Sequence, residues 1–450
     1  MSNKHIAVVG AGTAGLIFAH RMLRMGNRVT LFSDRTAQQW LHESPPTGSA
    51  FAYGISTDIE LAAGLNDHIR PCRPGDGILF DFVPAAGAEH VSLAGKFCNP
   101  GSAVDLRLRI SDWMHQFEIR GGNLVIEAMT LDRLTQISDE FDDIFIAAGK
   151  GDLGKLFGRN EERPHYPRPQ RKLIMMITEH IIDWQERSHV NNPVKFNFFA
   201  DGGEMFFVPY LHKSGRECYN ILFEAKEGSY MDVFDKSMSA EELNATARDW
   251  LRKYAPWDAS KVEHMSCVTG DKFSTLQGAV PPFVRNDFGE LPNGKTVFPL
   301  GDTWAVFDPI GGQGINNGSR QVNYVAERYI ELGGERASRE WASEHYGQFY
   351  ENHTRWATLF NNLLLEPLDE TGMTTLLFAV NNPRYCDEVI FGQFHAPKWV
   401  YKAFNDPAYA EAKWLRYAPF LQQRLHLPNW VPEGVANRVR QFSQRTASAA

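Results

Sequence analysis

The stretch His5-Ile-Ala-Val-Val-Gly-Ala-Gly-Thr-Ala-Gly15 decides the fold of this chain. Its apolar start predicts a buried strand, and apolar residues then recur at helical spacing up to Gly26, a residue type that commonly ends helices. Val29 to Phe32 predicts a second strand. Strand, glycine turn, helix and strand in so short a length form a βαβ unit, and the three glycines match the pattern of dinucleotide-binding proteins.

Each glycine of this turn has its own expected task. Gly10 permits the tight turn out of the strand, and Gly12 lets the backbone approach a pyrophosphate. Gly15 allows the helix to pack closely on the strand, and Ala14 lies at the helix N-terminus that faces the phosphates. A glycine-rich turn without a ligand is the alternative, but the strand and helix around the motif favour a dinucleotide site.

An acidic residue normally ends the second strand of such a unit and binds ribose hydroxyls. Here Ser33 takes that position and Asp34 follows it. We expect Asp34 to make the ribose contact, and an aspartate that merely belongs to the turn is the alternative.

A second motif lies far along the chain, at Leu300-Gly-Asp-Thr-Trp-Ala-Val-Phe-Asp-Pro-Ile-Gly-Gly-Gln-Gly-Ile-Asn316. Gly301-Asp302 follows an expected strand, and its carboxylate suits the ribityl hydroxyls of a flavin. Pro309, Gly312-Gln313-Gly314 and Asn316 introduce a helix whose first N–H groups would stabilise negative charge on a reduced flavin. A simple NAD dehydrogenase has no use for this motif. Both motifs together indicate FAD and resemble the flavoprotein aromatic hydroxylases.

That resemblance points to two further positions. Arg107, in Ser102-Ala-Val-Asp-Leu-Arg-Leu108, takes the place of an arginine that lies over the flavin phosphates, because a guanidinium matches phosphate geometry. A solvated helix arginine is the alternative. Gly149 closes the apolar run Asp143-Ile-Phe-Ile-Ala-Ala148 and is expected beside the cofactor.

The pattern along the chain predicts an α/β protein with a Rossmann-like FAD-binding domain, an inserted antiparallel sheet and a helical C-terminal region. We expect the first part of the FAD-binding domain over residues 1–165 and a substrate-binding sheet domain over 166–276, after the proline-rich crossover at 163–170. The FAD-binding domain returns over 277–330, and helices fill 331–450. The polar tail from Gln441 is expected to be disordered.

Composition narrows the functional classes. The 450 residues carry a net charge of −8 and no basic run, which disfavours nucleic acid as a partner. No apolar stretch is long enough to span a bilayer, and no signal-like region starts the chain. Five scattered cysteines favour a reduced, cytoplasmic protein, and no metal-ligand spacing supports a metal cofactor.

Nearly the whole chain resembles the oxygenase component of styrene monooxygenase and its indole-oxidising relatives. This resemblance implies a two-component enzyme, in which a separate NADH-dependent flavin reductase delivers reduced FAD and the oxygenase activates O2 through a C4a-hydroperoxyflavin. A small apolar aromatic substrate is then epoxidised or oxidised, styrene and indole being the family defaults. The resemblance is carried by the segments Val8–Leu16, Val104–Leu108, Ala148–Lys150, Leu153–Lys155, Pro169–Arg171, Leu276–Gly278, Val280–Pro281, Asn293–Lys295, Asp308–Pro309, Gly312–Gly314 and Arg355–Trp356.

Two departures bear on the use of the flavin. Single-component hydroxylases carry an Asp-Gly pair where this chain has Lys150-Gly151, which agrees with the absence of a nicotinamide site. In the loop Pro45-Pro-Thr-Gly-Ser49 the family has Asn-Thr near the flavin; Thr47 matches, and Pro46 replaces the asparagine.

The resemblance also assigns expected roles around the reacting oxygen and the substrate. Four positions are expected beside the chemistry: Thr47, Pro309, Gly312 and Gln313. The expected substrate pocket consists of Pro46, Met205, Phe207, Tyr210, Phe223, Trp304 and Phe307. For Pro46 the alternative is a rigid loop with no chemical role, and for the others it is an ordinary place in the core.

Two other functions stay open at this point: a single-component hydroxylase that takes NAD(P)H itself, and a flavin-binding protein without oxygenase turnover. A flavin halogenase is disfavoured because the chain has no Trp-x-Trp-x-Ile-Pro motif. A homodimer is one arrangement that the sequence leaves open.

Overall fold

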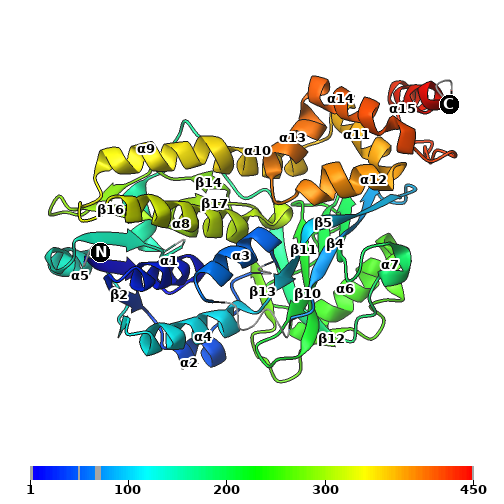
Figure 1. Ribbon diagram of the computed structural model, residues 1–450. Coiled ribbons are helices and arrows are strands. Elements are labelled where there is room, and N and C mark those ends of the chain that lie inside the picture. The colour runs from blue at the N-terminus through cyan, green and yellow to red at the C-terminus, as the bar shows by residue number, and fades with distance from the viewer. Residues whose placement is uncertain (1–3, 49–50, 66–71, 150, 448–450) are drawn as a thin grey trace.

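The computed structural model describes residues 4–48, 51–65, 72–149 and 151–447. Two large sheets lie side by side along the molecule, with helices packed on them (Figure 1). The chain starts with the expected βαβ unit, in which β1 (His5–Val9) and β2 (Arg28–Ser33) are parallel and α1 (Thr13–Arg24) connects them.

The first sheet has the strand order β15-β16-β7-β1-β2-β6 and is parallel apart from its edge strand β15. Alternate residues of β1 face opposite sides: Ile6 and Val8 pack toward α1 and α8, whereas Ala7 and Val9 pack toward α5. Both faces are therefore buried, as parallel sheets require. The remaining elements of this region are β6 (Asn123–Ile126), β7 (Asp143–Ile146), β15 (Gly289–Glu290), β16 (Thr296–Pro299), α2 (Ala37–Glu43), α4 (Leu106–Ile119), α5 (Leu131–Ile137) and α8 (Gln313–Glu331).

The second sheet has nine strands and is antiparallel except where β4 pairs with β9. It extends beyond the expected segment 166–276, because β3, β4 and β5 come from residues 51–103 and pair with it. Its strands are β3 (Phe51–Ala52), β4 (Gly75–Val83), β5 (Val91–Ala103), β8 (Lys172–Glu179), β9 (Val194–Phe199), β10 (Gly203–Leu211), β11 (Glu217–Ala225), β12 (Ser266–Cys267) and β13 (Thr275–Gly278).

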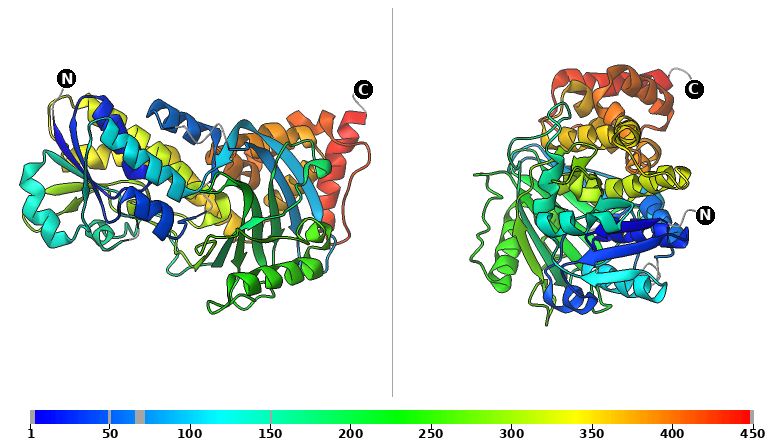
Figure 2. Two further views of the ribbon diagram at one scale, coloured as in Figure 1. Left: turned by 90° about the horizontal axis from the view of Figure 1, so that it is seen from below. Right: turned by 90° about the vertical axis from the view of Figure 1, so that its left-hand side faces the viewer.

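Helices cover both faces of the second sheet. The helix α6 (Ala240–Tyr254) packs on one face, through Leu243 and Trp250. The C-terminal helices pack on the opposite face, and Figure 2 shows them above one end of the sheet. The other helices and the small third sheet are α3 (Gly54–Ala62), α7 (Pro256–Ala259), α9 (Arg339–Phe349), α10 (Arg355–Leu365), α11 (Glu370–Val380), α12 (Pro383–Tyr385), α13 (Pro397–Asn405), α14 (Pro407–Tyr417), α15 (Glu433–Ala447), β14 (Phe283–Val284) and β17 (Ala305–Val306).

The expected fold class is confirmed: a Rossmann-like domain, an inserted sheet and a helical C-terminal region. The expected disorder is wrong for residues 441–447, because α15 continues to Ala447; residues 448–450 lie outside the described residues. Val435, Val439 and Phe442 repeat at helical spacing and join the core on the second sheet, which holds this polar segment in a helix. No helix among the described residues is long and apolar enough to cross a membrane.

Candidate active site

A cleft of about 1400 Å³ opens between the two sheets. One wall is formed by the carboxyl ends of β1 and β7, the place where ligands bind in open α/β sheets. The opposite wall comes from β8, β11 and β13. Many expected site residues line this cleft: Gly10, Gly12, Ala14, Asp34, Thr47, Gly149, Gly301, Asp302, Phe307, Pro309, Gly312 and Gly314.

The three glycines of the first turn differ in what surrounds them. A Cβ on Gly10 would lie 2.3 Å from the Ala147 carbonyl oxygen, and Gly10 has φ +110°. A Cβ on Gly15 would lie 2.1 Å from the Gly10 carbonyl oxygen. A Cβ on Gly12 would meet no described atom within 4 Å, although Gly12 borders the cleft. Gly10 and Gly15 thus serve close packing, and Gly12 leaves open space beside the backbone.

Two helices direct their N-termini into the cleft. The helix α1 begins after Gly12 and α8 begins after Gly312, which has φ +61°. Neither cap supplies a side-chain hydrogen bond, and neither first turn carries an acidic residue. The N–H groups and the positive ends of both helix dipoles are therefore available to a ligand with negative charge.

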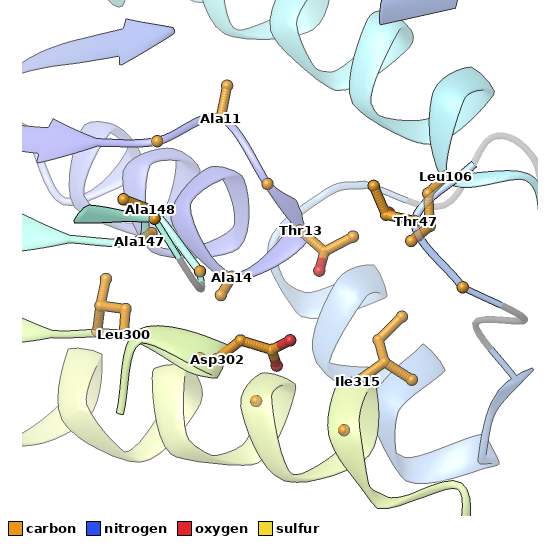
Figure 3. A pocket seen from close by; sticks show the side chains of 18 of the residues that line it. Ala11, Thr13, Ala14, Thr47, Leu106, Ala147, Ala148, Leu300, Asp302 and Ile315 are labelled. Atoms are coloured by element: carbon orange, nitrogen blue, oxygen red, sulfur yellow. The ribbon is translucent and has the colours of Figure 1, made fainter. Parts of the chain in front are cut away.

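Asp302 lies between these two N-termini, and its carboxylate points into the cavity (Figure 3). Hydrogen bonds to backbone atoms hold the turn that carries Asp302 in place. Arg285 donates from Nη1 to the Asp302 carbonyl oxygen at 3.1 Å, and the Gly301 N–H donates to Oε1 of Gln321 at 3.0 Å. Gln321 also donates to the Pro299 carbonyl oxygen at 3.1 Å. The sequence motif did not reveal Gln321, because it lies more than a helical turn beyond Asn316.

The far end of the cleft is lined by Asp34, Arg35 and Trp40. The Arg35 guanidinium lies 3.8 Å from the centre of the Trp40 ring and also pairs with Asp34 at 3.2 Å. The Ser33 hydroxyl instead donates to the Arg35 carbonyl oxygen at 2.6 Å, so it belongs to the turn. The stacked Arg35 and Trp40 form a flat surface that suits an aromatic ring, and sequence reasoning missed both residues.

Arg107 does not lie in the cleft, contrary to expectation. Its guanidinium is buried between Asp105 and Asp271, at 2.7 Å from each. Its neighbour Leu106 borders the cleft instead, because successive helix residues point in different directions. Burial would raise the pKa of Asp271, but hydrogen bonds from His212 and Arg107 outweigh it and hold that pKa well below its usual range.

Three of the expected substrate residues face away from the cleft. Met205, Phe207 and Phe223 pack in the core under α6, on the opposite face of the second sheet. Successive strand residues alternate between faces, so Leu222, one position before Phe223, borders the cleft. The apolar wall consists of Leu222 on β11, Leu173 and Met175 on β8, and Leu276 on β13.

Four further expected residues support the fold around the cleft. Trp304 is fully buried and donates from Nε1 to Asp287 at 3.0 Å. Tyr210 is buried in the sheet core outside the cleft lining, and burial raises its pKa well above the usual range. Pro46 is buried beside Thr47. Gln313 is buried as well and donates from Nε2 to the Gly311 carbonyl oxygen at 2.8 Å.

Asn316 links the start of α8 to β3 and α3. Its Oδ1 accepts from the Tyr53 N–H at 2.8 Å and from the Ser56 hydroxyl at 2.7 Å. Its Nδ2 donates to the Phe51 carbonyl oxygen at 2.9 Å. Asn316 therefore positions the helix N-terminus without lining the cleft.

Lys150, which stands where single-component hydroxylases have the aspartate of their Asp-Gly pair, lies outside the described residues.

The cleft fits FAD on its own geometry. It offers open backbone at Gly12, two uncapped helix N-termini, a carboxylate between them and a flat surface at one end. No group of three or more His, Cys, Asp or Glu side chains could hold a metal ion in the part of the chain that is described. All five cysteines are free thiols.

Comparison with known proteins agrees with this geometry. Residues 149–261 match the protein family described as "Styrene monooxygenase A putative substrate binding domain". Styrene monooxygenase StyA of Pseudomonas fluorescens is 26% identical over 424 residues, covering 92% of this chain and 99% of that protein. A second StyA, from Pseudomonas sp., is 26% identical over 412 residues, covering 90% of this chain and 96% of that protein.

Solved structures share the fold at low sequence identity. The flavoprotein/dehydrogenase from Cytophaga hutchinsonii has a TM-score of 0.62 and 13% identity, over 98% of this chain and 99% of that one. The halogenase PltM has a TM-score of 0.60 and 14% identity, over 99% and 97%. PqsL of Pseudomonas aeruginosa, described as a probable FAD-dependent monooxygenase, has a TM-score of 0.56 and 14% identity, over 80% and 95%.

Fold, cleft and relatives together define the class of protein: a flavin-dependent monooxygenase, with FAD as the cofactor that its relatives imply. Within that class, the near full-length similarity to StyA supports a styrene monooxygenase-like oxygenase.

Proposed function

We propose that this protein is the oxygenase of a two-component system. It binds reduced FAD made by a separate NADH-dependent flavin reductase and transfers one oxygen atom from O2 to a small apolar aromatic substrate, such as styrene or indole. The observation that carries the proposal is the similarity to StyA over 92% of the chain. The pair Lys150-Gly151, in place of the Asp-Gly of single-component hydroxylases, supports it.

The chain's own residues would bind and orient the cofactor. The N–H groups at the start of α1, beside Gly12, suit the pyrophosphate, and Asp302 suits the ribityl hydroxyls. The N-terminus of α8 suits the pyrimidine edge of the flavin, where its dipole would stabilise negative charge. Reduced FAD held there supplies the electrons that activate O2.

The opposite wall would hold the substrate and exclude water. Leu173, Met175, Leu222 and Leu276 present an apolar surface to the cleft, and Phe307 lies beside Asp302 and Pro309 on the cofactor side. An aromatic hydrocarbon gains free energy by leaving water for such a surface. Thr47 and Pro309 border the same space and are the proposed neighbours of the reacting oxygen.

The proposal is tested by changing the source of the two electrons that reduce FAD. With protein, FAD, NADH and styrene alone, we expect no substrate-dependent NADH oxidation. Adding an NADH-dependent flavin reductase, or chemically reduced FAD and O2, should yield oxygenated product from a panel of alkenes, indole and sulfides. Rapid NADH oxidation without the reductase would identify a single-component hydroxylase. Absence of product across the panel with reduced FAD would identify a flavin-binding protein without oxygenase turnover.

A further inference from the structure

A guanidinium and an imidazole meet between α8 and a π-helical turn, outside the lining of the cleft. The turn spans Tyr350–Thr354 and joins α9 to α10 (Figure 1). Thr354 donates from its hydroxyl to Oδ1 of Asn317 at 2.9 Å. Arg320, about one turn further along α8, donates from Nη1 to Nδ1 of His353 at 3.3 Å. Two successive residues of the turn are therefore held against α8, and turns of this kind are rare and often lie at functional sites.

The hydrogen bond from Arg320 fixes the protonation state of His353. A guanidinium is only a donor, so Nδ1 of His353 must be the acceptor and carries no proton. Burial, followed by the charges of Arg320 and His395, lowers the pKa of His353 to about 3. The imidazole is therefore neutral at pH 7, and its single N–H group lies at Nε2.

Two N–H groups of this pair lack an acceptor. Nε2 of His353 and Nη2 of Arg320 are sealed from solvent, and neither has a hydrogen-bond partner among the described residues. A buried donor that loses its hydrogen bonds to water without gaining others destabilises the folded state, so such groups are uncommon in native proteins. The group that is missing beside this pair is thus a hydrogen-bond acceptor.

The positive charge of Arg320 also lacks a partner of opposite sign. Glu351, the acid of the same turn, pairs with Arg355 at 2.8 Å, and over the described ranges no carboxylate forms an ion pair with Arg320. Burial lowers the pKa of Arg320 to about 10, so the guanidinium stays charged at pH 7, and the opposing effect comes from the Cys98 thiol. Cys98 itself contacts His395, with Sγ 3.4 Å from Nδ1.

A water molecule would meet only half of this requirement. It could accept from both N–H groups, but it would leave the charge of a partly buried guanidinium unpaired. Buried charges are ordinarily paired, because removing an ion from water without a counter-charge is costly. The acceptor that satisfies both the hydrogen bonds and the charge is an anion.

We propose that Arg320 and His353 bind a small halide-type anion, which accepts from Nη2 of Arg320 and from Nε2 of His353. Chloride carries no proton and accepts from several N–H groups at once, so it suits two donors that are sealed from bulk solvent. The bound anion holds α8, whose N-terminus borders the cleft, against the π-helical turn. This site is independent of the proposed function, since neither flavin nor substrate takes part in it.

Thermal unfolding of the full chain tests the site, in chloride and in the much larger anion gluconate at the same sodium concentration. FAD is present at one fixed concentration, because the helix N-termini at the cleft attract anions as well. We expect chloride to raise the Tm of the wild type along a saturable curve, by at least ~2 °C at 100 times its Kd. The rise should vanish in Arg320→Met. Arg355→Met is the matched control, an exposed arginine beside the same turn, and should keep the rise.

Two outcomes of the unfolding experiment would overturn the proposal. If chloride fails to stabilise the wild type, water rather than an anion meets the two donors. An equal rise in the wild type and in Arg320→Met would place the chloride elsewhere on the molecule.

Crystals of the wild type grown in bromide give a second measurement that does not require a variant to fold. Bromide resembles chloride and is located by its anomalous scattering. We expect an anomalous difference peak between Nη2 of Arg320 and Nε2 of His353. Crystals that show ordered bromide only at other places would contradict the site.

Discussion

Gly12 and Gly15 lie one helical turn apart at the start of α1, yet the structure gives them opposite surroundings. The position of a Cβ on Gly15 is 2.1 Å from the Gly10 carbonyl oxygen, whereas a Cβ on Gly12 meets nothing within 4 Å. Any side chain at Gly15 would therefore clash with backbone, and one at Gly12 would project into the space proposed for the pyrophosphate.

Gly12→Val tests the phosphate approach. Because Gly12 has φ −73° and open surroundings, we expect the variant to fold normally. Its FAD affinity should fall at least ~10-fold, about 1.4 kcal/mol, because the new methyl groups occupy ligand space. Fluorescence titration with FAD measures the affinity. Gly15→Val is the contrast, expected to lose stability in urea; normal FAD binding by Gly12→Val would refute the assigned role of this turn.

Asp302 is the other residue whose role depends on what it faces. Asp302→Ala should weaken FAD binding by roughly 10-fold, since hydrogen bonds to a carboxylate contribute about 1.5–3 kcal/mol. Stability should stay close to wild type, because Arg285 and Gln321 fix the turn through backbone atoms. Equilibrium dialysis against FAD measures the change. Asp139→Ala, an exposed acid outside the cleft, is the control, and equal affinities in all three proteins would remove Asp302 from the site.

At the scale of elements, two successive residues of α4 have different roles, because they point in different directions from the helix axis. Leu106 borders the cleft, and Arg107 lies with Asp105 and Asp271 in a buried ion cluster. The sequence pattern identifies the start of this helix but not the direction of each side chain. That direction depends on the loops of the second sheet, which carry Asp271 and His212 to the same place.

Arg107→Met should cost about 3–5 kcal/mol of unfolding free energy, because it leaves buried carboxylates without their cation. The FAD affinity of the folded variant should be close to wild type. Urea unfolding and FAD titration together measure both quantities. A triple variant that also carries Asp105→Asn and Asp271→Asn should recover part of the stability. A large loss of FAD affinity with little loss of stability would instead favour a phosphate contact.

Asp271 also predicts a dependence of stability on pH. Its pKa in the folded protein is held below the ordinary value, so the folded state favours the carboxylate. The resulting stabilisation is fully present above the unfolded pKa of about 3.9 and is lost as the pH falls below it. Urea midpoints between about pH 3 and pH 7 should therefore vary less in Asp271→Asn than in wild type. Parallel curves would contradict the assignment.

The alternation of side chains between the two faces of a strand explains why three residues of the expected substrate pocket do not line the cleft. Met205, Phe207 and Phe223 face α6, and of their two strands only β11 contributes a residue, Leu222, to the described lining of the cleft. Both faces of β10 and β11 are apolar and buried, so alternation in the sequence carries little information about which face meets the cleft. Only the packing of α6 on one face and the FAD-binding domain on the other distinguishes them.

At the scale of the whole molecule, the cleft belongs to neither sheet alone. A ligand bound there contacts both walls and stabilises the folded state by mass action, about 2.7 kcal/mol at 100 times Kd. FAD at such a concentration should raise the melting temperature by at least ~2 °C. Differential scanning calorimetry checks this shift. At the same FAD concentration Gly12→Val should show at most about half of this shift, and equal shifts in both proteins would mean that FAD stabilises the fold from somewhere other than this cleft.

The sequence by itself determined the βαβ unit, the second glycine motif and hence the FAD-binding fold, because these depend on local turns where only particular residues fit. It also predicted the inserted antiparallel sheet and the helical C-terminal region. The tertiary structure alone decided which side chains meet in the cleft. Arg107 belongs to a buried ion cluster, and Leu222 borders the cleft where Phe223 was expected, because each of these contacts joins segments that are distant in sequence and whose relative orientation no local pattern encodes.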